Sequence, residues 1–114
     1  MDVEITQRRE TEAQTITVWG RITAAEARPT RDGRTDWIPT KVKIIWARYS
    51  TNGSAWTHWT PSITVTGPKR RPGGETYGQY VDLVEAADPE WKAWVDELHP
   101  EQRTDGQVTP SGAM

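Results

Sequence analysis

The chain has 114 residues, a formal net charge of −2 and no cysteine. Its length favours one domain with a modest core, and the lack of cysteine excludes a disulfide framework and thiolate chemistry. Two well-separated histidines give no basis for a structural zinc site, and a pI of about 5.7 argues against non-specific nucleic-acid binding by the domain as a whole.

The composition favours strands over helices. Isoleucine, valine and threonine account for 31 residues, whereas leucine occurs only twice. β-branched side chains are stiff and fit a pleated, half-buried surface. Seven tryptophans, with no phenylalanine, supply the bulk that the sparse aliphatic residues do not. We therefore predict a mainly antiparallel β protein with an amphipathic set of aromatic rings.

The first half of the chain predicts two long strands joined by a loop. Residues 1–13 read as a polar arm or a short edge strand, because their few apolar residues alternate. Residues 14–23 alternate clearly and form the first strand. Residues 24–36 contain turn signals and form a loop. Residues 41–49 are apolar on both faces, so this strand is expected to lie centrally in the sheet.

The middle of the chain predicts a hairpin followed by a basic loop. Asn52 and Gly53 both tolerate positive φ and favour a two-residue hairpin turn. Residues 56–59 and 62–66 supply short returning strands that Pro61 separates. Residues 67–75 then form an exposed loop rich in lysine and arginine.

The last part of the chain predicts one strand, one helix and a tail. Residues 76–84 alternate, with Val81 and Leu83 on one side and Val84 on the other. The helix spans 88–99, because an aspartate in the N-cap position precedes a proline at the first helical position. Residues 101–114 are polar and read as a flexible tail.

We therefore predict one β-rich domain of the α+β type over residues 1–100. Its core is a single antiparallel sheet of five or six strands with one C-terminal helix packed on it, and a small sandwich or barrel is the alternative. The apolar stripe of the helix has i, i+3, i+4 and i+7 spacing and consists of Trp91, Trp94, Val95 and Leu98. We expect it to pack against Ile44, Trp46, Val81 or Leu83.

The first candidate binding surface follows the hairpin turn. Trp56 and His58 point to one side of a strand and Trp59 points to the other. Burial of both rings in the core is the simpler interpretation. The alternative is that one exposed ring serves as a binding platform, for example for a carbohydrate, or stacks on a basic side chain.

The second candidate surface is the basic loop. Lys69, Arg70 and Arg71 lie between prolines and glycines, which is typical of a solvated hairpin tip. The functional interpretation is a loop that contacts phosphates or an acidic partner, with Tyr77 and Tyr80 close enough to stack on bases. Three charges give little affinity at physiological salt, so the sequence does not favour nucleic acid.

Neither histidine has a nucleophile in a recognisable motif nearby, and no catalytic, metal or cofactor pattern stands out. The sequence thus predicts a non-enzymatic binding or interaction module without cofactor. Its expected partner is another protein or copies of itself. One alternative is a nucleic-acid binder that uses the basic loop, and another is a structural virion or assembly component whose tail orders on neighbouring subunits. No run is long and apolar enough for a membrane span, so we expect a cytoplasmic protein.

One resemblance covers the C-terminal half. The runs 63–68, 88–91 and 96–100, together with the preference for Arg, Thr, Ala and Trp over Lys and Phe, resemble short uncharacterised accessory proteins of actinobacteria and their phages. The resemblance is one of style and attaches no activity. It implies a phage or mobile-element accessory protein, located in the host cytoplasm or in the virion.

Overall fold

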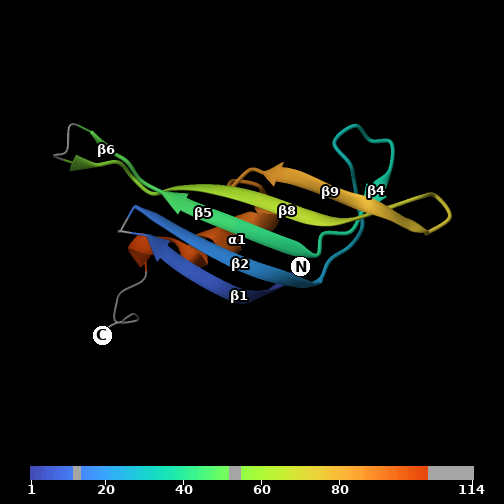
Figure 1. Ribbon diagram of the computed structural model, residues 1–114, viewed down its shortest axis with the longest axis horizontal. Helices are drawn as coiled ribbons and strands as arrows, with labels where there is room; N and C mark the ends of the chain where they lie inside the picture. The colour runs from blue at the N-terminus through green and yellow to red at the C-terminus, as the bar shows by residue number, and fades with distance from the viewer. Residues whose placement is uncertain (12–13, 52–54, 103–114) are drawn as a thin grey trace.

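The computed structural model describes residues 1–11, 14–51 and 55–102 (Figure 1). It is an elongated molecule of 54 × 30 × 23 Å. In chain order its elements are β1 (Asp2–Thr11), β2 (Thr15–Ala24), β3 (Arg28–Pro29), β4 (Asp36–Trp37), β5 (Lys41–Ala47), β6 (Ser50–Thr51), β7 (Ala55–Trp56), β8 (Thr60–Arg70), β9 (Thr76–Val84), α1 (Pro89–Leu98) and a 3-10 turn (Pro100–Gln102). The predicted fold class is confirmed: the protein is mainly β, with one C-terminal helix.

Seven strands form one antiparallel sheet. The long strands follow the order β1-β2-β5-β8-β9. β5 pairs with the segment 60–66 of β8, and β4 pairs further along the same strand with Lys69 and Arg70. β4 therefore continues the line of β5, and β3 flanks it. β6 and β7 form a separate two-stranded pair. The Asn52-Gly53 turn that was predicted there lies outside the described residues.

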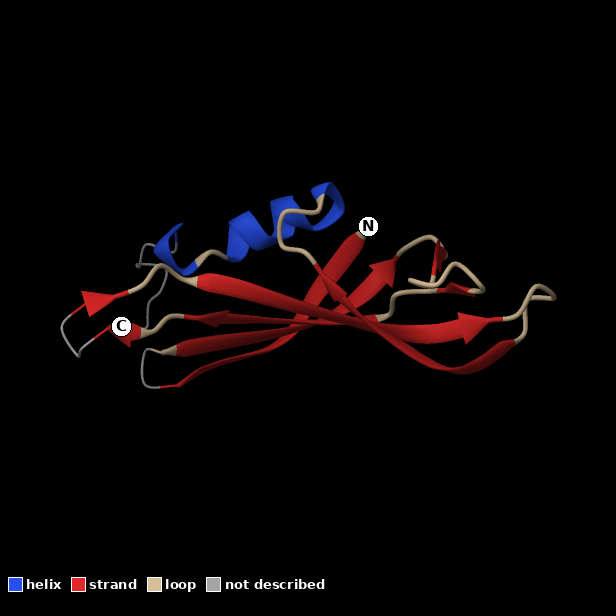
Figure 2. Cartoon of the chain, turned by 90° about the horizontal axis from the view of Figure 1, so that it is seen from above, coloured by secondary structure: helices blue, strands red, loops and turns tan. Residues whose placement is uncertain are grey.

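The helix covers one face of this sheet and leaves the other uncovered (Figure 2). Alternate residues of β2, β5 and β8 are buried beneath it, as the predicted period of two requires. Ile44, Val65 and Trp91 are completely buried. The core cluster consists of Ile16, Val18, Ile22, Trp37, Val42, Ile44, Trp46, Ile63, Val65, Val84, Trp91 and Val95.

Two strands are longer than the sequence indicated. The N-terminal segment is a ten-residue edge strand, β1, paired with β2 along its whole length. β8 runs through Pro61 and Pro68 to Arg70, so the expected loop over 67–75 shrinks to the turn at 71–75. Proline is tolerated close to a strand end and at irregularities, and the β8–β9 register shifts between Pro68 and Arg70.

The predicted packing of the helix is correct in one part and wrong in another. Trp91 joins Ile44 and Trp46 in the core as expected. Val81 and Leu83, however, lie on the opposite face of β9 and are 59% and 64% exposed. Both faces of β9 carry apolar residues, so the alternation alone does not identify the buried one. The helix covers the face that carries Val84.

The helix begins as predicted. The Asp88 side chain accepts a hydrogen bond from the Glu90 backbone N–H at 2.9 Å, and Pro89 occupies the first turn. We expect Asp88→Ala to lower the free energy of unfolding by about 1 kcal/mol, because one backbone N–H loses its acceptor. Urea denaturation measures this. Asp88→Asn, which keeps an acceptor, is expected to retain most of the stability.

Three buried indole N–H groups lack a hydrogen-bond partner within the described residues: those of Trp37, Trp46 and Trp91. Each of these rings instead contacts another ring. The ring centroids of Trp37 and Tyr80 are 5.0 Å apart. Those of Trp46 and His99 are 4.7 Å apart, in an edge-on arrangement. Trp91 meets Trp94 edge-on at 6.0 Å. Within the described residues these three indoles thus have aromatic neighbours and no polar partner for their N–H groups.

α1 does not have the length and apolarity that a membrane crossing requires, and the same holds for any helix in the described ranges. The predicted tail, 101–114, falls mostly outside them. Its first two residues belong to the 3-10 turn.

Candidate interaction surfaces

The side of the sheet away from the helix is a continuous surface. We call it the open face. Its side chains alternate with the buried ones along four strands, and register places them in rows across the sheet. It consists of Thr15, Thr17, Trp19, Arg21, Lys41, Lys43, Ile45, Ala47, Thr60, Ser62, Thr64, Thr66, Val81 and Leu83.

One edge of the open face is apolar. Leu83 and Val81 on β9 are more than half exposed. They are opposite Thr64 and Thr66 of β8, whose short side chains do not cover them. An exposed leucine alone needs no explanation. Here Val81 and Leu83 lie together on the same face of β9, so the edge offers an apolar strip of two exposed side chains.

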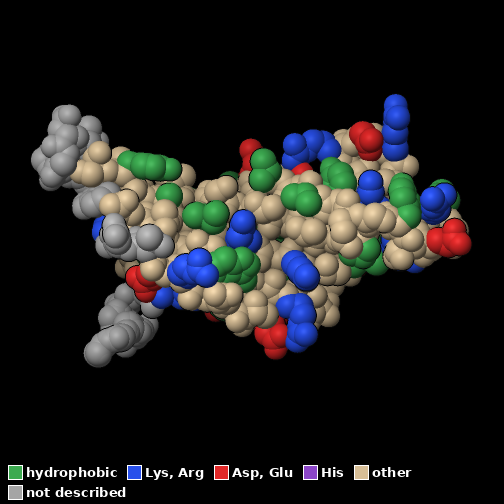
Figure 3. All heavy atoms as spheres, viewed as in Figure 1, with side chains coloured by type: hydrophobic (Ala, Val, Ile, Leu, Met, Phe, Trp, Pro, Cys, Tyr) green, Lys and Arg blue, Asp and Glu red, His purple; other side chains and the backbone are tan. Residues whose placement is uncertain are grey.

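The middle and the far edge of the open face are basic. Lys43 and Trp19 are cross-strand partners, as are Lys41 and Arg21. Arg9 on β1 places its Cζ atom 5.5 Å from the centroid of the Trp19 ring. Arg21 pairs with Glu4 at 2.5 Å. Figure 3, which shows this face, has lysine, arginine and hydrophobic side chains in the middle and acidic side chains only at the margins.

The opposite layer carries the opposite charge. Residues 85–102 hold six acidic residues and one basic residue, Lys92, whereas residues 1–84 hold twelve basic and nine acidic residues. Lys92 pairs with Asp96 on the helix at 2.9 Å, and Arg28 reaches Glu90 from the sheet side at 2.9 Å. The small net charge of the chain is therefore the sum of a basic segment, residues 1–84, and an acidic segment, residues 85–102, which contains the helix.

The predicted basic loop becomes the end of the β8–β9 hairpin, which we call the hairpin end. Lys69 and Arg71 flank the ring of Tyr77, with the Lys69 Nζ 5.4 Å and the Arg71 Cζ 4.6 Å from the ring centroid. Both contacts are of the cation–π type. The structure thus brings three of the predicted residues together, and the Tyr77 ring, which is 36% exposed, contacts two of this chain's own cations.

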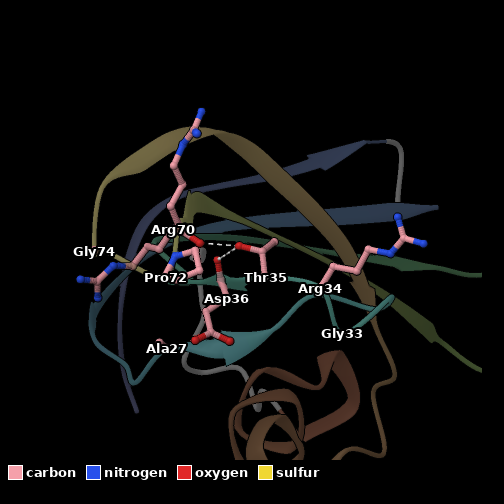
Figure 4. Close-up of a pocket in the computed structure, with 9 residues that line it drawn as sticks. Ala27, Gly33, Arg34, Thr35, Asp36, Arg70, Pro72 and Gly74 are labelled. Atoms are coloured by element: carbon pink, nitrogen blue, oxygen red, sulfur yellow. Dashed lines mark hydrogen bonds between the residues drawn. The ribbon is translucent and has the colours of Figure 1, made fainter.

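A shallow groove separates this hairpin end from the loop before β4 (Figure 4). The Thr35 hydroxyl donates to the Arg70 carbonyl oxygen across it. The guanidinium groups of Arg34 and Arg70 point away from one another, and Asp36 adds a carboxylate to the lining. Because the cations do not converge, the groove lacks the geometry of an anion site.

Tyr80 is not available for stacking. Its ring packs on Trp37, and its hydroxyl accepts a hydrogen bond from the Arg31 backbone N–H at 2.7 Å. The Arg31 side chain also pairs with Asp82 and donates to the Leu83 carbonyl at 3.2 Å. Tyr80 therefore holds the loop before β4 against β9. The sequence does not reveal this role, because the contact joins residues 49 positions apart.

Two side chains of the other predicted surface, those of His58 and Trp59, lie within the described residues. The Trp59 ring is partly buried, with the Arg48 guanidinium 4.7 Å from its centroid. His58 is exposed. The side chain of Trp56 lies outside the described residues.

One carboxyl group in the loop before β4 has a shifted pKa. The Thr30 hydroxyl donates to Asp32 at 2.6 Å, and the Arg34 backbone N–H donates at 3.0 Å. These bonds, the first above all, favour the ionised form and lower the pKa of Asp32 below its usual value.

This shift gives a pH-dependent prediction. A lowered pKa in the folded state stabilises the loop above the pKa of the unfolded chain, and the contribution is lost as pH falls through the folded value. We expect Thr30→Val to raise the pKa of Asp32 towards its usual value, as followed by NMR titration of the carboxyl carbon. An unchanged titration in the variant would contradict the assigned cause. Thr40→Val, remote from Asp32, is the control.

Among the described residues no group of three or more His, Asp or Glu side chains could hold a metal ion. The comparisons identify no relative: no family model, no curated protein and no solved structure matches the chain. The open face is an extensive surface that the sequence analysis did not single out. The pattern in the sequence that could have indicated it is the presence of apolar residues on both faces of β9, of which the helix covers only one.

Proposed function

We propose that this protein is a small, non-enzymatic interaction module that binds a protein partner through its open face. The observation that carries the proposal is the composition of that face. It joins exposed apolar residues, Val81 and Leu83, to the basic residues Lys41 and Lys43 in the same cross-strand rows. A partner that offers both carboxylates and apolar side chains complements both parts.

A protein partner suits these observations better than nucleic acid. The basic hairpin end was the predicted nucleic-acid site, but Lys69 and Arg71 already contact the Tyr77 ring, and Tyr80 packs on Trp37. Exposed aliphatic side chains give no hydrogen-bond readout of bases. They do supply apolar contact area to another protein.

The proposal is tested by NMR titration of the uniformly ¹⁵N-labelled chain. Three probes are compared: a peptide that alternates glutamate and leucine, its counterpart with lysine in place of glutamate, and a single-stranded oligonucleotide. We expect the glutamate peptide to shift backbone amides along β5, β8 and β9, and the lysine peptide to leave them unchanged.

Two variants locate the contact. Val81→Ser combined with Leu83→Ser is expected to weaken binding of the glutamate peptide roughly tenfold, because the apolar strip is removed. Ile5→Ser is the matched control, since Ile5 is 47% exposed but pairs with Gly20 on the helix side of the sheet. No amide shifts with the glutamate peptide would overturn the proposal. Oligonucleotide shifts at residues 69–77 that vanish when Lys69, Arg70 and Arg71 become alanine would establish the nucleic-acid alternative instead.

We also propose a phage or mobile-element origin, which rests on the resemblance of the runs 63–68, 88–91 and 96–100 and on the preference for Arg, Thr, Ala and Trp over Lys and Phe. An accessory protein of that kind would act by contact with other proteins, which agrees with an interaction module.

A further inference from the structure

We propose that the partner of the open face is a second copy of this chain, whose acidic helix layer packs against it. The helix layer is the outer surface of residues 85–102. The inference rests on the proposed function, since it uses the same face, and it adds the identity of the occupant. It follows from charge complementarity between two surfaces of one molecule.

The open face has cations that no residue within 1–11, 14–51 and 55–102 neutralises by an ion pair. Lys41 and Lys43 form no ion pair within the described residues. The carboxylate on this side, Glu4, is engaged by Arg21. Two lysines on adjacent positions of one face, with threonines around them, attract an acidic surface and repel another copy of the same face.

The helix layer has carboxylates that likewise form no ion pair within the described residues. Glu85 and Glu97 are exposed and form no ion pair in the part of the chain that the structure describes. Ala87, Pro89 and Ala93 are also exposed on this layer, beside the longer side chains of Glu90 and Lys92. The alanines and the proline offer apolar contact area to the strip at Val81 and Leu83.

The two surfaces lie on opposite sides of the two-layer molecule (Figure 2). An interface between them is heterologous, because one copy uses its sheet and the next uses its helix. Each added copy leaves one surface of each kind free. The assembly therefore grows into a stack, or closes into a ring if the rotation between copies permits it. This is the geometry of a structural assembly component, one of the alternatives that the sequence left open.

The test is sedimentation velocity of the full chain at several concentrations in low and high salt. We expect the weight-average sedimentation coefficient to rise steadily with concentration in low salt. In about 0.5 M salt, where charges are screened beyond roughly 4–5 Å, the chain is expected to sediment as a monomer.

Charge reversal identifies the two surfaces. The open-face variant carries Lys41→Glu and Lys43→Glu, and the helix-layer variant carries Glu85→Lys and Glu97→Lys. Each is expected to lower the association constant at least about tenfold, because like charges then face each other. All four substitutions together restore complementarity and the wild-type net charge, so we expect association to return. The control is Arg34→Glu with Arg71→Glu, which changes net charge as the open-face variant does but lies at the hairpin end.

Three results would overturn the inference. The first is a wild-type chain that stays monomeric in low salt. The second is a variant with all four substitutions that remains folded by circular dichroism but fails to regain association. The third is a dimer that grows no further. The last result would indicate a symmetric contact, for example between β1 edges. A monomer that still binds the glutamate–leucine peptide would reject self-assembly and leave the proposed function standing. Loss of both would reject both.

Discussion

Gly67→Ala is expected to destabilise the fold by more than about 3 kcal/mol, which is a large part of the stability of a domain of this size. A Cβ atom at Gly67 would lie 1.8 Å from the carbonyl oxygen of Ile38 and 3.0 Å from the Cα of Pro39. Both contacts are with backbone, so no side-chain rotation relieves them. The segment from β4 to β5 would have to leave β8.

That movement would break specific bonds. The Ile38 N–H donates to the Pro68 carbonyl at 3.1 Å, and the Thr40 N–H donates to the Thr66 carbonyl at 2.9 Å. Gly73→Ala is the control, because a Cβ there meets nothing within 4 Å and the backbone has no positive φ. We expect a change of no more than about 0.5 kcal/mol for it. Urea denaturation measures both, and equal stability of the two variants would contradict the crossing of the 38–40 segment over Gly67.

Trp91→Ala is expected to cost about 3–5 kcal/mol, because it removes a completely buried ring that fixes the helix to the sheet. Trp91 contributes to the same core cluster as Ile44 and Trp46. Its loss leaves a cavity between the two layers that the sheet cannot close. We expect the urea midpoint to fall and the helix to become less protected in hydrogen exchange.

Trp19→Ala is the matched comparison. It deletes the same side chain from the open face, where Trp19 is only partly buried and Arg9 is its cation–π partner. We expect a loss of about 1 kcal/mol. If Trp19→Ala were as destabilising as Trp91→Ala, the open face would be part of a second core and not a surface.

The sequence predicted the parts of this fold that depend on local signals. The alternation in β2 identified its buried face, the apolar residues of β5 indicated its central place in the sheet, and the aspartate and proline at 88–89 located the start of the helix. The basic residues of the hairpin end were also recognised. Each of these features follows from a pattern within a few residues.

The features that were missed depend on contacts between distant segments. Val81 and Leu83 form a face as apolar as the one opposite, and only the position of the helix decides which is covered. Tyr80 was expected at the surface, but Trp37 and Arg31 reach it from a loop far away in sequence. The role of Gly67 as a crossing point is equally invisible, because the glycine resembles a turn signal before Pro68.

The face of β9 that carries Leu83 is open to solvent, while the opposite face, which carries Val84, is buried. Because the chain has no cysteine, single-cysteine variants Leu83→Cys and Val84→Cys can be compared directly by their rates of reaction with a thiol reagent in dilute, high-salt solution. We expect the cysteine at 83 to react at close to the rate of a free thiol. The cysteine at 84 should react at least about a hundredfold more slowly, since it requires opening of the core. Equal protection at both positions would show that the face with Leu83 is also buried within the monomer, so that no open face exists.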